Sequence, residues 1–242
     1  MKTILIIIAF LFVGNITSFS QVISPCNDEN CTDPYHSASK TFYMPCCPNC
    51  PITVNYLWHI CNGAIEIEIQ SIGYNNPVTP FCASLVSWLY DQGSSFDNIK
   101  QMYHLAYEEI AKQTFMIEYN SLPANVKYLL ECPNGNRKYG FTVASCTHYC
   151  GYNDFAAQMS RIVQLSCNAT NCCKIEYRIC WNTTTQQVDV VRTTTLIGTP
   201  NCPTTPPECP ATYPAPGIYT TGQAPPDMIF DGRSTPCGIS CE

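Results

Sequence analysis

Residues 50–70 read CPITVNYLWHICNGAIEIEIQ, and this stretch decides the fold that we expect. Apolar and aromatic side chains take alternate positions over 52–60, and the alternation returns over 65–69. Asn62-Gly63, between the two runs, is a turn dipeptide that joins neighbouring antiparallel strands. The stretch therefore predicts a β-hairpin with one apolar face.

Two helices are expected after this hairpin. Thr79-Pro80 has the form of a helix start, and Gly93 marks the end of that helix. Ser94 begins a second segment, whose apolar residues recur at helical spacing as far as Ile117. This pattern predicts two consecutive helices that pack an apolar stripe against the core.

The pattern returns to strands in the second half of the chain. Alternation of apolar and polar residues, with one short apolar run, predicts further strands over 126–130, 139–143, 162–165, 175–179 and 188–196. The last two form another hairpin. Strands, then helices, then strands indicate an α+β fold of antiparallel, disulfide-rich hairpins with two central helices.

The N-terminus has the form of a secretory signal peptide over residues 1–20. Lys2 precedes an apolar run over 4–13, and Ser18 and Ser20 supply small side chains before a cut after residue 20. The run is too short to cross a bilayer comfortably, and no later stretch has the ~20 apolar residues that a membrane helix needs. We expect a secreted protein, extracellular or at the cell surface, without a membrane span.

The cysteines predict a disulfide framework. Cleavage after residue 20 leaves all 18 cysteines in the mature chain, and an oxidising exterior would let up to nine bridges form and persist. Zinc is the alternative, but a zinc site needs four ligands at defined spacing, and only residues 47–50 have a C-x2-C spacing. The expected disulfide cysteines are Cys26, Cys31, Cys46, Cys47, Cys50, Cys61, Cys82, Cys132, Cys146, Cys150, Cys167, Cys172, Cys173, Cys180, Cys202, Cys209, Cys237 and Cys241.

Three segments follow the signal peptide. Residues 21–50 form a cysteine-rich lead, residues 51–199 form the α+β body, and residues 200–242 form a proline- and threonine-rich C-terminal arm. The prolines favour an extended conformation for the arm. Because four of its residues are cysteines, we expect disulfides to anchor it on its own body or on a neighbouring chain.

A weak repeat lies within the body. A strand runs from Cys50 to Cys61 and a similar one from Cys173 to Cys180, and the next cysteine follows 21 residues after the first strand and 22 after the second. The matching intervals predict two related hairpin units. The repeated residues are apolar, aromatic and cysteine, which favours a structural role.

Charge and motifs argue against several classes of function. The formal net charge is -6 and no Lys/Arg cluster is present, whereas nucleic-acid phosphates attract a positive face. The sequence has no G-x-S-x-G elbow, H-E-x-x-H motif, P-loop or dinucleotide fingerprint. We therefore predict no catalytic, cofactor-binding or metal site and no nucleic-acid partner.

Three local pairs have a chemical alternative. Residues 47–50 have the spacing of a thioredoxin-like redox pair, but a strand follows them where a helix would be needed. Glu66 and Glu68 share one face of a strand, which a solvated strand face explains. His104 and Glu108 lie one helical turn apart, and a polar helix face explains both. We expect no catalytic role for any of these pairs.

The favoured function is that of a secreted, non-enzymatic structural or surface protein. Only 12% of the residues are charged, about half the usual fraction, which favours association. An arm that adds to the sheet edge of a neighbour would produce an oligomer or a filament. The expected partners are other copies of the chain or another extracellular protein. The alternative is a secreted adhesin or a glycan- or protein-binding module, and a small secreted hydrolase ranks third.

Overall fold

The computed structural model describes residue 31 and the ranges 33–61, 63–75, 80–91, 93–167, 171–214 and 227–241. In these ranges eleven strands join one mixed sheet, accompanied by two α-helices. The broad prediction of a disulfide-rich α+β fold is confirmed, although strands dominate. The predicted signal peptide and Cys26 lie outside the described residues.

The predicted hairpin of residues 50–70 lies at the centre of the sheet. β2 (Cys47–Cys61) and β3 (Ala64–Asn75) pair antiparallel, and Gly63 in their turn has a φ of 78°, which glycine adopts at little steric cost. β1 (His36–Met44) pairs with the other side of β2. β1 was not predicted, and it lies within residues 21–50, the expected cysteine-rich lead.

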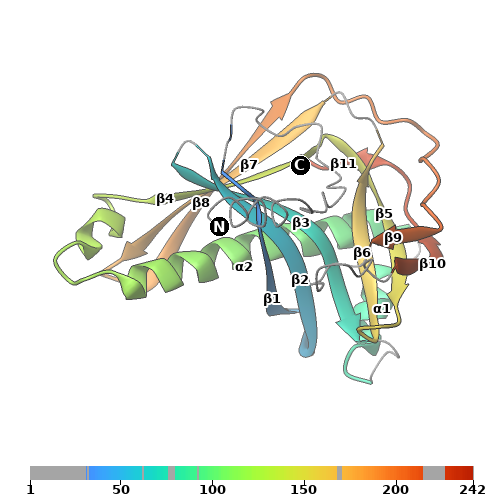
Figure 1. Cartoon of the computed structure of the whole chain (residues 1–242), viewed down its shortest axis with the longest axis horizontal. Coiled ribbons are helices and arrows are strands. Elements are labelled where there is room, and N and C mark those ends of the chain that lie inside the picture. The colour runs from blue at the N-terminus through green and yellow to red at the C-terminus, as the bar shows by residue number, and fades with distance from the viewer. Residues whose placement is uncertain are drawn as a thin grey trace, which may run out of the picture.

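The sheet forks at β3, because its free side pairs with two different strands. Residues 65–67 run parallel to β4 (Arg137–Ala144), and residues 72–75 run antiparallel to β6 (Met159–Ser166). One branch continues through β7 (Cys172–Asn182) to β8 (Gln187–Ile197). The other continues through β5 (Cys146–Asp154) to β10 (Asp227–Ser234) and β9 (Thr212–Pro214). Figure 1 shows the two branches diverging from β3.

The parallel pairing of β3 with β4 corrects the expectation of a wholly antiparallel sheet. Parallel neighbours need a long crossover connection, and here the helical segment between the two strands provides it. A β-bulge also interrupts the β2–β3 ladder, since Asn55 pairs with Ser71 but the next residue, Tyr56, pairs with Ile69. Gln70 is therefore the extra residue on β3, and bulges bend the strand that carries them. The bulge coincides with the point at which the branches separate.

The long helix α2 (Ser95–Ser121) crosses one face of the sheet and passes both branches (Figure 1). Its buried side includes Ile99, Tyr103 and Ile110, which join one core with apolar residues of β2, β4 and β7. Ile117 is exposed instead, which corrects the predicted stripe. Towards the end of α2 the buried positions are Phe115 and Tyr119.

The first helix, α1 (Ala83–Leu89), begins three residues after Pro80. Its N-cap is Cys82, which is bonded to Cys50 of β2 and ties the helix to the sheet. Thr79, the predicted cap, lies outside the described residues. The bridge thus coincides with the start of the helix.

In the second half of the chain one predicted strand is absent and one observed strand was not predicted. Residues 126–130 contain the 3-10 helix η1 (Lys127–Leu130), because three alternating residues also fit a single turn that buries Leu130. β5 was missed because almost every residue in it is buried, so its sequence shows no alternation. The predicted strands of β4, β6, β7 and β8 are present.

The described part of residues 200–242 packs on the chain's own body. β10 and β11 (Gly238–Ile239) pair with β5, and β9 pairs with β10. Four disulfides reinforce this arrangement, namely Cys146–Cys202, Cys150–Cys209, Cys167–Cys237 and Cys173–Cys241. Strand pairing and bridges therefore hold the described residues of the expected C-terminal arm against other strands of the same chain.

Three more bridges complete the described disulfides: Cys31–Cys61, Cys50–Cys82 and Cys132–Cys180. Cys172 is also disulfide-bonded. The two hairpins of the proposed repeat carry bridges to non-equivalent partners, since Cys82 bonds to Cys50 whereas Cys202 bonds to Cys146.

Of the predicted disulfide cysteines, Cys46 and Cys47 are not bridged in the structure. Cys46 lies in the turn between β1 and β2, and Cys47 begins β2, so each is the nearest unbridged cysteine to the other among the described residues. Among those residues, no helix combines the length and apolar character that a membrane crossing requires.

Candidate functional site

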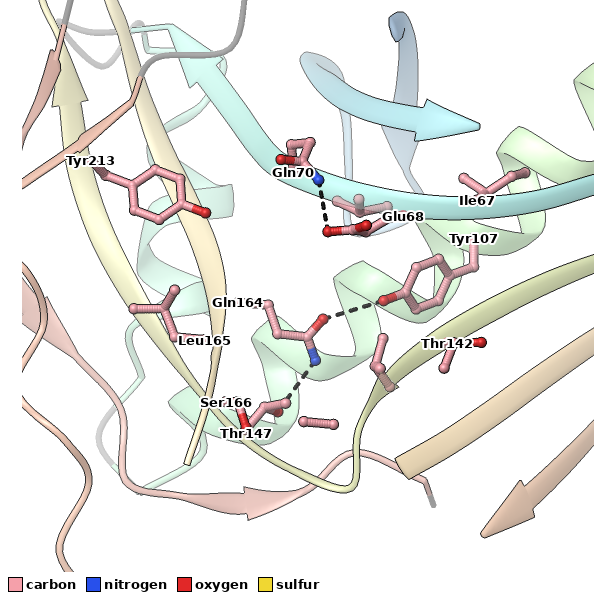
Figure 2. Close-up of a pocket in the computed structure, with 13 residues that line it drawn as sticks. Ile67, Glu68, Gln70, Tyr107, Thr142, Thr147, Gln164, Leu165, Ser166 and Tyr213 are labelled. Carbon is pink, nitrogen blue, oxygen red and sulfur yellow. Dashed lines mark hydrogen bonds between the residues drawn. The ribbon is translucent and has the colours of Figure 1, made fainter. Parts of the chain in front are cut away.

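A pocket opens where the two branches of the sheet part (Figure 2). None of the described strands fills the space beside residues 68–70 of β3, because β4 has ended its pairing there and β6 has not yet begun. The cavity measures about 80 Å³, whereas one water needs only ~10–15 Å³. Its lining comes from β3, β4, β5, β6, β9 and α2, and comprises Ile67, Glu68, Ile69, Gln70, Tyr107, Thr142, Val143, Ala144, Thr147, Gln164, Leu165, Ser166 and Tyr213.

One side of the pocket is a hydrogen-bonded chain centred on Gln164. The Tyr107 hydroxyl donates to Gln164 Oε1 at 3.2 Å, and Gln164 Nε2 donates to Thr147 Oγ1 at 3.2 Å. Thr147 Oγ1 lies 2.6 Å from Ser240 Oγ, so a residue of the C-terminal segment extends this hydrogen-bonded chain. Because both ends of the Gln164 amide are engaged, the side chain is held in one orientation at the cavity (Figure 2).

The opposite side is the bulged stretch of β3. Gln70 Nε2 donates to Glu68 Oε1 at 2.9 Å, which joins the two side chains. Figure 2 shows both side chains across the cavity from Gln164. The bulge places Gln70 at the fork, as bulges commonly do when they redirect a side chain beside a site.

Tyr213 reaches the pocket from the C-terminal segment. The Cys150–Cys209 bridge and the pairing of β9 with β10 hold it there, and its ring centroid lies 5.6 Å from that of Tyr152. In Figure 2 its hydroxyl points toward the cavity. The pocket therefore has an aromatic side chain beside its polar groups.

The electrostatics of the pocket are those of a weakly acidic, otherwise neutral site. Among the residues that the structure describes, its lining contains Glu68 and no Lys, Arg or His. Burial raises the pKa of Tyr213 to about 12, with a smaller contribution from Glu68. Burial also raises the pKa of Tyr107 well above its usual value. Both phenols consequently remain protonated at neutral pH and act as neutral hydrogen-bonding groups.

No family model, curated protein or solved structure matches this chain. The side chains that line the pocket offer amide, carboxylate and hydroxyl groups beside one tyrosine ring, and they are preset by hydrogen bonds within the protein. A few fixed polar groups in a concave site are the usual features of small-ligand recognition.

Glu66 and Glu68 do not form the solvated strand face that their spacing predicts. The Glu66 side chain is only 14% exposed, and its carboxylate lies 3.2 Å from Lys174 Nζ and 3.6 Å from His59 Nε2. Gly140 lies between Glu66 and Lys174, where a Cβ atom would come within 3.6 Å of Glu66 Cγ. Glu66 is therefore part of an ion-pair cluster, whereas Glu68 lines the pocket.

The pair His104 and Glu108 has no shared chemistry in the structure. Glu108 forms an ion pair with Lys112 at 2.5 Å. Burial lowers the pKa of His104 to about 4, with smaller contributions from Arg192 and Lys100, so this imidazole is neutral at physiological pH. Both residues are explained by packing and pairing on α2.

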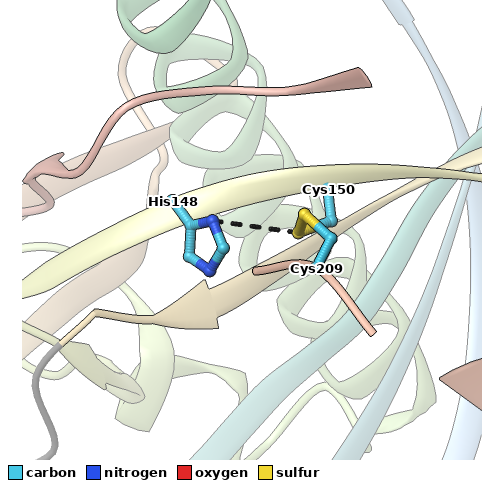
Figure 3. A group of neighbouring side chains, drawn as sticks. All are labelled: His148, Cys150 and Cys209. Carbon is cyan, nitrogen blue, oxygen red and sulfur yellow. Dashed lines mark hydrogen bonds between the residues drawn. A yellow bond between two sulfur atoms is a disulfide. The ribbon is translucent and has the colours of Figure 1, made fainter. Parts of the chain in front are cut away.

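His148, Cys150 and Cys209 bring three possible metal ligands close together (Figure 3). His148 Nδ1 lies 3.8 Å from Cys150 Sγ, but Cys150 and Cys209 are bonded to each other. Metal binding by cysteine requires the thiolate, which a disulfide does not supply. The same reasoning applies to the group formed by Glu66 with the bonded pair Cys31 and Cys61.

Residues 47–50 do not form a redox pair either. Cys50 lies in β2 and is bonded to Cys82, the N-cap of α1. This bond to a third cysteine removes Cys50 as a redox partner of the Cys47 thiol.

The pocket has no signature in the sequence, because its residues share no motif. Gln70, Tyr107, Gln164 and Tyr213 belong to four different elements. None has a diagnostic neighbour in the sequence. Only the branching of the sheet at β3 brings them together.

Proposed function

We propose that this chain is a secreted, disulfide-stabilised binding protein whose pocket at the sheet fork takes one sugar residue or a similar neutral polyhydroxyl unit. The observation that carries this proposal is the pair of preset polar walls: Gln164, fixed by Tyr107 and Thr147, lies across the cavity from Glu68 and Gln70. Preset groups lose little conformational entropy when a ligand arrives.

The chemistry of the lining supports a hydroxyl-rich ligand. Carboxylate and amide oxygens accept from sugar hydroxyls, and the amide nitrogens of Gln70 and Gln164 donate to them. The ring of Tyr213 offers an apolar surface for the C–H groups of a sugar. Phosphates and carboxylates are disfavoured, because the described part of the lining has one acid and no cation. The small cavity favours entry of one edge of a ring.

The lining favours binding over hydrolysis. Glycoside hydrolysis ordinarily uses two carboxyl groups on opposite sides of the scissile bond. Glu68 is the single carboxylate among the lining residues that the structure describes. These residues therefore supply only one half of that acid/base pair.

The disulfides and the N-terminal sequence support secretion. Seven bridges between described residues are typical of a protein that matures in an oxidising compartment. Residues 1–20 have the charge, apolar run and small residues of a signal peptide. A stapled, poorly charged binding protein suits an extracellular or cell-surface location.

Glycan binding should weaken about tenfold or more when Gln164 or Gln70 is replaced by alanine, because partner groups lose their hydrogen bonds. The oxidised protein would be applied to a glycan array, and each hit would be measured by calorimetry with the free sugar. Gln101→Ala is the matched control, since Gln101 is exposed on α2 away from the pocket.

Failure of the folded wild-type protein to bind any arrayed glycan would contradict the proposal. Equal affinities for wild type and both pocket variants would also contradict it. Small amines provide a further comparison. If a cationic amine binds more strongly than any neutral sugar, Glu68 serves to bind cations and the proposal of a sugar ligand is wrong.

A second candidate function is self-association through the edge strand β8. Among the described strands β8 pairs only with β7. Consecutive residues 191–197 of β8 are all exposed, so this part of the strand is uncovered on both faces. Val191 is 61% exposed, and Leu196 and Ile197 are also exposed. A long, uncovered edge strand readily pairs with another strand, and an identical chain offers the same edge. This route replaces the predicted C-terminal arm, whose described residues pack on their own body.

Val191→Lys should abolish any concentration-dependent oligomer, because a charge at a sheet edge opposes strand addition. Light scattering after size exclusion and negative-stain microscopy would measure it over a wide concentration range. Thr185→Lys, at the exposed β7–β8 turn, is the control for added charge. A wild-type protein that stays monomeric at all concentrations would exclude this second function.

A further inference from the structure

We infer that Cys46 and Cys47 form a vicinal disulfide in the mature protein, closing a ring at the turn between β1 and β2. Their sulfur atoms lie 2.6 Å apart. Non-bonded carbon atoms are most favourably placed about 3.5–4.0 Å apart, and sulfur is larger than carbon. Two thiols at this separation would repel each other, whereas a covalent bond removes the repulsion.

No other described cysteine is available to either residue. Fourteen of the described cysteines form the seven bridges, and Cys172 is also bonded. Cys46 and Cys47 are the two free thiols among the described residues. In an oxidising compartment that forms all the other bridges, their nearest partner is each other.

The local chain keeps the two residues together. β1 ends at Met44 and β2 begins at Cys47, so Pro45 and Cys46 make the tight turn between them. Met44 pairs with Cys47 across this turn. Pro45 and Pro48 flank the pair and restrict the backbone of the residues before them. Little chain entropy remains to be lost when the ring closes.

Burial makes this bridge different from the others. Cys47 is 3% exposed and belongs to the main core cluster, whereas Cys46 is exposed. Cys46 is the one cysteine among the described residues whose side chain is exposed. An external thiol would therefore reach the sulfur of Cys46 before that of any other described bridge, so the ring is the site of selective reduction.

The oxidation is a two-electron exchange with a small-molecule disulfide such as glutathione disulfide. One Cys thiolate attacks this disulfide, forms a mixed disulfide and expels one glutathione thiolate. The second Cys thiolate then attacks the protein sulfur and expels the second. Two S–H bonds and one S–S bond are lost, one protein S–S bond and two glutathione thiols form, and the two protons pass to glutathione.

Thiol labelling tests the inference directly. The chain, expressed with secretion and purified without reductant, would be denatured in guanidinium with N-ethylmaleimide and weighed by mass spectrometry. We expect no adduct on the wild type and one on each of Cys46→Ser and Cys47→Ser. If the native wild type is treated with a low dose of phosphine and then labelled with N-ethylmaleimide, the first product should carry two adducts. The same dose should give no adduct on the double serine variant, which retains all other bridges.

Two adducts on the wild type without reduction would overturn the inference, as would a disulfide-linked dimer that Cys46→Ser abolishes. Adducts that appear first at other cysteines after mild reduction would overturn the claim of selective reduction. Because the ring closes only two adjacent residues, its loss removes little entropy from the unfolded chain. The serine variants should therefore fold, and their circular dichroism spectra provide the check.

Discussion

Replacing Asp154 with alanine is expected to lower the free energy of unfolding by about 3–5 kcal/mol. Asp154 ends β5, and Arg161 Nε donates to its Oδ2 at 2.7 Å, with the two side chains only 4% and 5% exposed. Asp154 Oδ1 also accepts from the backbone of Ala157 at 2.9 Å, so the same carboxylate holds the β5–β6 turn. The variant would leave the Arg161 guanidinium buried without a counter-charge.

Urea unfolding followed by circular dichroism under non-reducing conditions would measure this loss. Asp97→Ala is the matched control, because Asp97 pairs with Lys100 but its side chain is 74% exposed, and exposed pairs contribute no more than about 1 kcal/mol. The double variant Asp154→Leu/Arg161→Met should recover much of the lost stability, since it removes both charges. Equal small losses for Asp154→Ala and Asp97→Ala would show that the buried pair contributes little.

Removal of the Cys150–Cys209 bridge by alanine at both positions is expected to cost about 4 kcal/mol, from the chain entropy of the loop that it closes. The bridged residues are 59 apart, and Cys150 belongs to a small core with Tyr152, Val163 and Met228. The same bridge fixes the segment that carries Tyr213 to the pocket. The variant should therefore lose both stability and affinity for the glycan.

The bridge Cys132–Cys180 provides the matched control. Its cysteines are 48 residues apart, so the chain-entropy model assigns it nearly the same stabilisation. It joins β7 to the segment that follows η1, and neither β7 nor η1 contributes a residue to the described lining of the pocket. Its double alanine variant should be as destabilised as the Cys150–Cys209 variant while binding the glycan normally below its unfolding transition. If both variants lose glycan affinity equally, the affinity does not depend on the position of Tyr213, and the prediction is wrong.

The two proposals for the pocket and for the Cys46–Cys47 ring are independent of each other. The ring lies at the β1–β2 turn, whereas the pocket lies on the opposite side of β3 from β2. Serine at both ring positions should therefore leave glycan affinity unchanged. Each proposal can fail while the other stands.

Local patterns in the sequence were enough to predict the central hairpin, the two helices and the last hairpin. Alternation over 52–60 and 65–69, with Asn62-Gly63 between them, depends on side chains a few residues apart. The buried side of α2 likewise follows from helical spacing. β5 had no such signal, because a strand buried on both faces loses its alternation.

The sequence by itself determined that the chain is rich in cysteine, forms strands around a long amphipathic helix and has a hairpin at its centre. These properties depend on composition and on interactions between residues close in the chain. Only the tertiary structure decided that β3 has two different neighbours, that a bulge places Gln70 at their separation, and that the C-terminal segment carries Tyr213 back to the same point. Pairing between distant strands, and the choice of partner for each cysteine, depend on how the whole sheet and core pack together, so neither has a local signature.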